Sequence, residues 1–263
     1  MFKHFYLKPL SFILIFTFVC SSCVSRKDVS YFQAESENTE LQSAETAPVY
    51  VANIKRGDIL QIIVSSLSPE SGVMFNPYAA MIGKSENSSN SLPPANGYLV
   101  DEDGNITLPL VGKIQLAGLS TGKATVLITQ KLDKFLQQPT ASLRILNYNI
   151  SVMGEVNRPS VYTIPNERIT LPEALSLAGD LTIFGKRKNI MVIREVNGKR
   201  EFGRVDLTKR DLFSSPYYYL HSNDVVYVEA NTGKFTAGDK TAQVLPIVIS
   251  VLSLIGIFLT FSR

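Results

Sequence analysis

The sequence predicts an α+β fold, and three observations support this class. Short runs rich in β-branched residues, such as residues 58–64 and 225–228, are typical of strands. Apolar residues at helical spacing follow Ser120 and Thr170, so each half of the folded region is expected to contain a helix. Turn dipeptides such as Asn197-Gly198 separate the strand-like runs. Strands that alternate with turns and include a helix in each half indicate a mixed fold.

The first half of the folded region is predicted to begin at a turn. Arg56-Gly57-Asp58 introduces the strand over 58–64, and this explains the triplet better than an adhesion motif does. Residues 65–96 predict a mobile loop insertion, and Asp103-Gly104 sets up a small hairpin. A strand over 141–147 closes this half. Before it lies a helix capped by Ser120 or Thr121, with the apolar face Ala124, Leu127, Ile128, Leu132, Phe135 and Leu136.

The second half contains the best-signalled helix of the chain. Thr170 is a predicted N-cap, Glu173 completes a capping box, and Gly179 follows the helix end. Pro172 falls in the first turn, where a missing N–H costs nothing. The strands predicted around this helix cover residues 150–153, 161–164, 190–194, 200–207 and 225–228.

The N-terminus predicts an exported lipoprotein. A basic start and the apolar run over 10–19 lead to small residues before Cys23, as in a lipoprotein signal that is cut before a cysteine. Residues 1–22 are therefore a predicted signal peptide, Cys23 a lipidation site, and 23–47 a polar, flexible linker. An uncleaved anchor helix is the alternative. Both cysteines of the chain lie here, so processing leaves no thiol for a disulfide, a metal or a nucleophile.

The C-terminus predicts a transmembrane helix over 244–261, after a linker over 231–243. About 18 largely apolar residues at 1.5 Å each extend roughly 27 Å, close to the thickness of a hydrocarbon core. A buried globular helix is the alternative. One helical stripe carries small and hydroxylated residues that suit helix packing or a pore lining: Pro246, Ser250, Ser253, Gly256 and Thr260.

The composition argues against catalysis, a cofactor, a metal site and nucleic-acid binding. A net charge of +3 on 263 residues leaves no nucleic-acid footprint. The mature chain has one histidine, His221, which is interpreted as a loop residue rather than a metal ligand. The acidic run Asp101–Asp103 precedes Gly104 and is typical of a turn rather than of a glycosidase acid pair. We therefore expect a protein that is not an enzyme.

In five stretches the residues resemble the bacterial outer-membrane polysaccharide export proteins. The order and spacing of these stretches across most of residues 50–230 make the resemblance specific. The stretches are IKRGDIL at 54–60, VDEDGNITLPLVGKIQLAG at 100–118, VMGEVNRP at 152–159, TLPEAL with AGDLT at 170–182, and YL with NDVVYV at 219–228.

The resemblance implies an export domain over 48–147 and one SLBB-type β-grasp domain over 148–230. It further implies an outer-membrane lipoprotein with periplasmic domains that assembles into a ring, often an octamer, and conducts capsular or exopolysaccharide. An inner-membrane co-polymerase, often a tyrosine kinase, is the implied partner. The chain departs from the long members of the family because its single β-grasp domain is followed directly by the terminal helix. A wide water-filled pore lined by that helix would be poorly hydrated.

Candidate sugar contacts are polar and aromatic loop residues, namely Asn87, Asn90, Tyr217, Tyr218 and Tyr219. Packing is the alternative role for the tyrosines. Two other functions remain open: a scaffold that links parts of an export machine without touching the sugar, and a periplasmic lipoprotein that binds a soluble ligand. Val24 after the lipidation site favours the outer membrane over the inner one.

Overall fold

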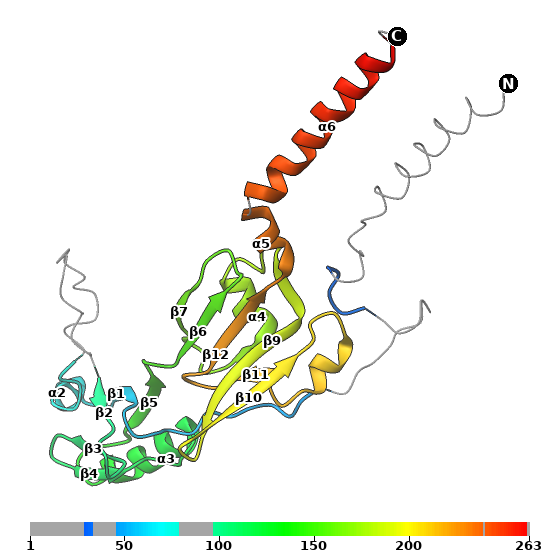
Figure 1. The fold of residues 1–263 in the computed structure, drawn as a ribbon. Coiled ribbons are helices and arrows are strands. Elements are labelled where there is room, and N and C mark those ends of the chain that lie inside the picture. The colour runs from blue at the N-terminus through cyan, green and yellow to red at the C-terminus, as the bar shows by residue number, and fades with distance from the viewer. Residues whose placement is uncertain (1–28, 34–45, 79–96, 239, 262–263) are drawn as a thin grey trace.

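The computed structural model describes residues 29–33, 46–78, 97–238 and 240–261, and has the predicted α+β class (Figure 1). The N-terminal domain comprises the segment over 49–58 and the elements from the first strand to the fifth. Its elements are β1 (Ile59–Ser65), α2 (Pro69–Val73), β2 (Tyr98–Leu99), β3 (Asn105–Leu108), β4 (Gly112–Gln115), α3 (Thr121–Leu132) and β5 (Thr140–Ile145).

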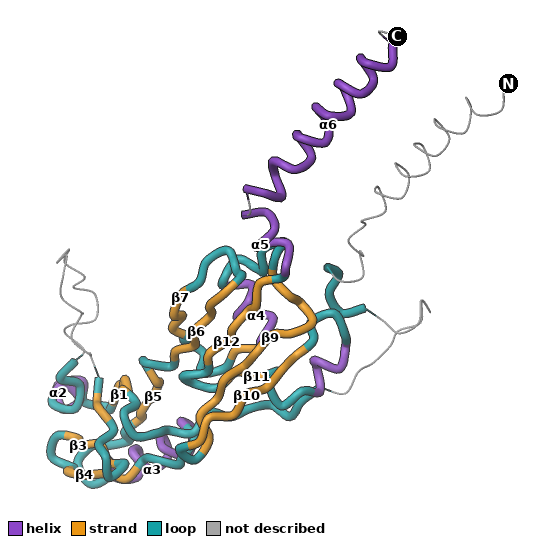
Figure 2. The backbone as a smooth tube through the Cα atoms, viewed as in Figure 1, coloured by secondary structure: helices purple, strands orange, loops and turns teal. Residues whose placement is uncertain are grey.

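The C-terminal domain follows, and two helices come after it (Figure 2). Its elements are β6 (Asn149–Gly154), β7 (Ser160–Thr163), β8 (Ile169–Thr170), α4 (Leu171–Leu177), β9 (Gly185–Val196), β10 (Lys199–Val205), the 3-10 helix η3 (Arg210–Ser214), β11 (Tyr219–Leu220) and β12 (Val225–Ala230). The two helices after it are α5 (Thr232–Gly238) and α6 (Lys240–Phe261).

A three-stranded antiparallel sheet, in the order β2-β1-β5, forms the N-terminal domain together with α3. The Ser120 side chain caps α3 by accepting from the Lys123 amide, as predicted. The helix buries Ala124, Ile128 and Leu132 and packs against β5. It ends at Leu132, so the predicted apolar face was too long. Phe135 lies beyond the helix end and is 47% exposed.

Both predicted turns of this domain are confirmed. Gly57 has a φ of +81°, a left-handed conformation that glycine adopts without steric cost. Asp58 is buried and accepts a hydrogen bond of 2.7 Å from the Lys55 amide, so the triplet is a turn. Asp101 likewise accepts from the Asn105 amide at 2.7 Å ahead of the β3-β4 hairpin. The predicted loop over 65–96 contains α2, and its residues 79–96 lie outside the described part of the chain.

A five-stranded mixed sheet, in the order β10-β9-β12-β6-β7, forms the C-terminal domain. The β12-β6 pair is parallel and every other pair in this sheet is antiparallel. The helix α4 contacts β6 and buries Leu171, Ala174 and Leu175. One continuous cluster of buried apolar residues includes side chains from both domains, for example Ile62 of β1 and Val226 of β12. The two domains therefore share a core.

Part of the predicted linker over 23–47 packs on the C-terminal domain. The amides of Phe32 and Gln33 donate to the carbonyls of Leu207 and Thr208 at 3.1 and 2.7 Å. The Tyr31 hydroxyl donates to Asp180 at 2.6 Å. Polar composition led to the linker prediction, but two adjacent aromatic residues and paired backbone groups are sufficient to dock a short segment. Residues 34–45 lie outside the described part of the chain.

The predicted linker over 231–243 is helical instead. Its first part is α5, which an ion pair between Lys234 and Glu155 joins to the sheet. The Asn231 amide also donates to the Phe184 carbonyl at 2.7 Å. The second part is the start of α6, which covers the predicted helix over 244–261. Figure 1 shows α6 leaving the end of the molecule that lies away from the N-terminal domain.

No helix in the described residues has both the length and the hydropathy of a membrane span. The transmembrane helix predicted over 244–261 is therefore not confirmed.

A buried ion pair organises the edge of the C-terminal domain that faces the N-terminal domain. Arg194 of β9 and Asp224, just before β12, meet at 2.7 Å, with side chains only 8% and 1% exposed. The Arg194 guanidinium also donates to the carbonyls of Pro216 and Tyr219 at 3.2 and 2.9 Å. Asp224 accepts from the His221 amide at 2.8 Å. The pair thus fixes residues 216–224 through both of its charged groups.

The ring of Tyr217 lies under the Arg194 guanidinium, at 5.2 Å from its carbon to the ring centroid. Gly203 of β10 makes room for this ring, because a Cβ at position 203 would lie 2.2 Å from a ring carbon. Burial raises the pKa of Asp224, while Arg194 and the His221 amide oppose that rise by stabilising the carboxylate. A buried charge that keeps its hydrogen bonds is tolerated, whereas an unpaired one is costly.

We predict that Arg194→Met lowers the free energy of unfolding by about 3 to 5 kcal/mol, because it leaves the Asp224 carboxylate buried without an opposite charge. Urea unfolding of the detergent-solubilised protein measures this change. Arg200→Met, at an exposed arginine of the neighbouring strand β10, is the matched control, with an expected effect within about 0.5 kcal/mol. Equal effects of the two substitutions would contradict the structural role of the pair.

Candidate functional site

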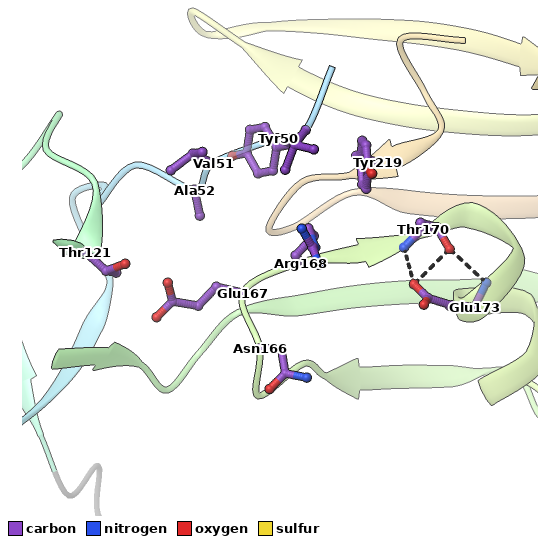
Figure 3. A pocket seen from close by; sticks show the side chains of 11 residues that line it. Tyr50, Val51, Ala52, Thr121, Asn166, Glu167, Arg168, Thr170, Glu173 and Tyr219 are labelled. Atoms are coloured by element: carbon purple, nitrogen blue, oxygen red, sulfur yellow. Dashed lines mark hydrogen bonds between the residues drawn. The ribbon is translucent and has the colours of Figure 1, made fainter. Parts of the chain in front are cut away.

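An open cleft of about 600 Å³ lies where the two domains meet (Figure 3). Its volume is in the range of small-molecule sites. The N-terminal domain contributes the extended segment Val49–Ala52 and Thr121 at the start of α3. The C-terminal domain contributes the turn Asn166–Arg168, Thr170 and Glu173 at the start of α4, and Tyr219 of β11.

The turn Asn166–Arg168 is held across the domain junction. The Glu167 carboxylate accepts a hydrogen bond of 2.7 Å from the Ile145 amide at the end of β5. Glu167 has a φ of +53°, a left-handed conformation that costs a residue with a Cβ on the order of 1 kcal/mol. Unfavourable backbone conformations persist where surrounding contacts impose them, often at functional sites. The bond to Ile145 is one such contact, and it sets the position of the neighbouring Arg168.

The predicted capping box of α4 forms one rim of the cleft. The Glu173 carboxylate accepts from the Thr170 amide and hydroxyl, both at 2.8 Å, and the Thr170 hydroxyl accepts from the Glu173 amide at 3.3 Å. Both reciprocal bonds are present, so the prediction is confirmed. The cap fixes the Glu173 side chain at the cleft through one of its oxygens, Oε2, as the dashed lines in Figure 3 show.

The segment Val49–Ala52 is attached to the C-terminal domain by a ring stack. The Tyr50 ring lies on the His221 imidazole with centroids 3.9 Å apart and planes 17° apart. Burial, followed by the nearby charges of Arg194 and Lys55, lowers the pKa of His221 to about 4. The imidazole is therefore neutral at pH 7 and suited to packing against Tyr50. His221 is a loop residue, and no group of three metal-ligating side chains occurs among the described residues.

Of the three tyrosines predicted as sugar contacts, Tyr219 lines the cleft. Tyr217 packs under Arg194, and Tyr218 packs edge-on against Phe213 and Tyr219. Burial raises the pKa of Tyr218. Tyr217 and Tyr218 therefore have the alternative role, packing, while Tyr219 lies where a ligand could contact it.

The other predicted site residues lie elsewhere. Cys23, Asn87 and Asn90 fall outside the described residues. The helical stripe is on α6, which projects away from both domains (Figure 1). There the Ser250 hydroxyl donates to the Pro246 carbonyl at 2.7 Å, and the Ser253 hydroxyl donates to the Ser250 carbonyl at 2.8 Å. The stripe also includes Gly256 and Thr260. The side chain of Thr260 lies outside the described part of the chain.

Several cleft residues were not predicted from the sequence, among them Tyr50, Asn166, Glu167 and Arg168. They lie in segments that are more than 110 positions apart, from residue 50 to residue 166. Each alone is an ordinary polar or aromatic loop residue, and no motif spacing connects them. The turn signal at Pro165-Asn166 marks the loop but says nothing about what faces it.

The cleft has the chemistry of a binding site. It combines two tyrosine rings, two carboxylates, one guanidinium and small polar side chains, and one side is open to solvent. Within the described chain Arg168 forms no ion pair, and the hydroxyls of Tyr50 and Tyr219 form no hydrogen bond. These groups are available to a ligand. Catalysis would need a nucleophile or base with an orienting partner, and the carboxylates here are engaged in the turn and the cap instead.

We predict that the His221–Tyr50 stack weakens in acid. The unfolded chain binds a proton at an ordinary pKa near 6.5, whereas the folded chain binds it only near 4, so acidification favours unfolding. Stability should fall as the pH decreases from 6.5 towards 4. Thermal unfolding of wild type and His221→Phe at pH 7 and pH 5 tests this, since phenylalanine keeps a ring that does not titrate. An identical pH dependence in both proteins would contradict the assignment.

Comparison with protein families matches both domains. Residues 46–146 match the polysaccharide biosynthesis/export protein family, and residues 148–228 match the SLBB domain. The two matched segments follow each other directly and cover all of the cleft residues.

Three curated relatives are similar to this chain over part of their length. The EPS I polysaccharide export outer membrane protein EpsA of Ralstonia solanacearum is 28% identical over 226 residues, covering 81% of this chain and 58% of EpsA. The capsule polysaccharide export outer membrane protein CtrA of Neisseria meningitidis serogroup A is 25% identical over 189 residues, covering 69% of this chain and 45% of CtrA. The capsule polysaccharide export protein BexD of Haemophilus influenzae is 26% identical over 133 residues, covering 49% of this chain and 32% of BexD.

The chain thus spans less than two thirds of the length of these relatives. The matched family consists of transport proteins and not of enzymes, which agrees with the expectation from the composition. The resemblance found in the sequence is confirmed, and the chain belongs to the polysaccharide biosynthesis/export family and carries an SLBB domain.

Proposed function

We propose that the protein is a subunit of an outer-membrane exporter of capsular or extracellular polysaccharide, assembled as a homo-oligomeric ring. The observation that carries this proposal is the ordered match of an export domain and an SLBB domain over residues 46–228. The relatives named as polysaccharide export proteins of the outer membrane support the substrate class and the location. An inner-membrane co-polymerase or tyrosine kinase would deliver the polymer.

The cleft supports transport rather than storage of the polymer. Conduction requires binding that is strong enough for entry and weak enough for release. An open cleft with dispersed polar groups meets this requirement better than a closed pocket with a dense charge cluster. In this proposal the SLBB domain is a β-grasp module, and its junction with the export domain guides the polymer.

Both tethers are proposed to leave from the same end of the SLBB domain. In the segment over 180–187, Asp180 accepts a hydrogen bond from the Tyr31 hydroxyl, and the Phe184 carbonyl accepts one from the amide of Asn231, the residue before α5. Cys23 lies eight positions before Tyr31, so a lipid on Cys23 would be within about 28 Å of this docking point. A lipidated start and the helix α6 would then attach the same end of the molecule to the outer membrane.

The surface of α6 supports anchoring more than pore lining. Its apolar side chains are exposed on all sides of the helix, for example at Ile249, Leu252, Leu254 and Ile257, which are 57, 62, 70 and 58% exposed. A helix that lines water needs one polar face, while a helix that is apolar all round is normally covered by lipid or by other helices. We propose that α6 inserts its apolar surface into the membrane region of the assembly.

The same observation favours a second candidate function, that of a scaffold. Without a polar face on α6, the chain would hold the export machine at the outer membrane while another protein forms the conduit. The two functions differ in whether the ring itself surrounds the polymer.

We predict that deletion of residues 244–263 abolishes surface polysaccharide in the native bacterium, because the ring loses its attachment through α6 and keeps only the lipid tether at Cys23. Immunoblots of membrane fractions and staining of surface polysaccharide measure the two effects. Replacement of the same residues by a leucine-rich helix of equal length is the control, and it should restore attachment. Full export by the truncated protein would contradict the role of α6.

Chemical crosslinking of the detergent-extracted protein should give a ladder of multimers, and a strict monomer would contradict the ring.

A further inference from the structure

We propose that the cleft between the export and SLBB domains binds an uncharged, hydroxyl-rich segment of the saccharide. This inference rests on the proposed function and deepens it, because it locates a contact site and names the class of sugar. The cleft exists only where the two domains meet, since Val49–Ala52 and Thr121 form one side and the SLBB residues form the other. It is not a property of either domain alone.

The first support is the pair of tyrosines. Tyr50 comes from the export domain and Tyr219 from the SLBB domain, and both line the cleft (Figure 3). Aromatic rings have a negative face, which attracts the C–H groups that a sugar ring presents on its flat side. The hydroxyls of both tyrosines lack hydrogen-bond partners among the described residues. One face of the Tyr50 ring is covered by His221. Each tyrosine therefore offers its hydroxyl and the part of its ring that lines the cleft to one ligand.

The second support is the set of polar groups between them. Glu167 uses Oε1 to accept from Ile145, and Glu173 uses Oε2 to accept from Thr170. In the described chain the other oxygen of each carboxylate has no partner, and Arg168 has no ion pair. Sugar hydroxyls both donate and accept, so they can satisfy the carboxylates and the guanidinium together. Because the turn and the cap already fix both carboxylates, little side-chain entropy is lost on binding.

The charge balance selects the class of sugar. Two carboxylates and one guanidinium line the cleft, so an acidic sugar would meet more repulsion than attraction. A neutral unit avoids this repulsion and still uses every polar group. The openness of the cleft suits a passing segment of a long chain better than a small enclosed ligand.

Photocrosslinking in the native bacterium tests the site and does not require the sugar to be identified first. Tyr219 is replaced by benzoylphenylalanine in the full chain, and the irradiated protein is probed for attached carbohydrate. Phe202 of β10, an aromatic residue with 63% exposure and outside the cleft, receives the same probe as a matched control. We expect sugar-linked protein from position 219 and at least several-fold less from position 202. Equal crosslinking at the two positions, or none at 219, overturns the inference.

Asn166, exposed on the rim of the cleft, serves as a second probe position if the Tyr219 replacement fails to accumulate. Arg168→Ala combined with the probe at 219 should reduce the crosslink several-fold, while Arg200→Ala should leave it unchanged.

Binding of the detergent-solubilised protein to immobilised neutral and acidic glycans tests whether the cleft prefers an uncharged sugar. Retention of neutral glycans, lost in Arg168→Ala, is expected, and a preference for acidic glycans overturns the assignment.

Measuring the surface polysaccharide of the same strains distinguishes a failure of the proposed binding site from a failure of the proposed export function. If wild type restores polysaccharide to a deletion strain and the cleft crosslink is absent, the binding site is wrong while the export function stands. If wild type restores nothing, the proposed function itself fails.

Discussion

The buried ion pair between Arg194 and Asp224 is the interaction on which the junction depends. Its two charged groups bind backbone atoms of residues 216–221, which no regular sheet pairing holds over most of their length. That loop places Tyr219 in the cleft and His221 against Tyr50 of the other domain. Isolated buried charges are expensive, and this pair is tolerated because each of its charged groups also binds a nearby backbone group. The Arg194–Asp224 pair thus holds the loop of the SLBB domain that contacts the export domain.

Local signals in the sequence predicted the elements that are stabilised locally. Thr170 and Glu173 specify the start of α4 by their own hydrogen bonds, so the capping box can be recognised from neighbouring residues alone. The turns at Gly57 and Asp101 were predicted for the same reason. The cleft was not predictable, because Tyr50 and Arg168 become neighbours only through tertiary packing. The resemblance to export proteins identified the family but did not show which loop residues share a surface.

The predictions of linkers over 23–47 and 231–243 were incomplete for the same physical reason. Polarity predicts that a segment cannot form its own core, yet it does not exclude docking on a core built by other residues. Tyr31 and Phe32 dock through backbone pairing and aromatic contacts with the SLBB domain. The helix α5 docks through its Lys234 and through Asn231, the residue before it. Both segments meet the SLBB domain close to residues 180–187, so one end of that domain holds the segments that lead to both termini.

Hydrogen exchange at residues 218–224 tests most directly whether the ion pair holds the junction together. The amides of His221, Asn223 and Asp224 donate to Asp224, Asn149 and His221 in the folded protein. We predict that these amides exchange nearly as slowly as those of β12 in wild type, and become selectively fast in Arg194→Met while β12 stays protected. Exchange of the loop at the rate of an unstructured peptide in wild type, with β12 protected, would contradict the account.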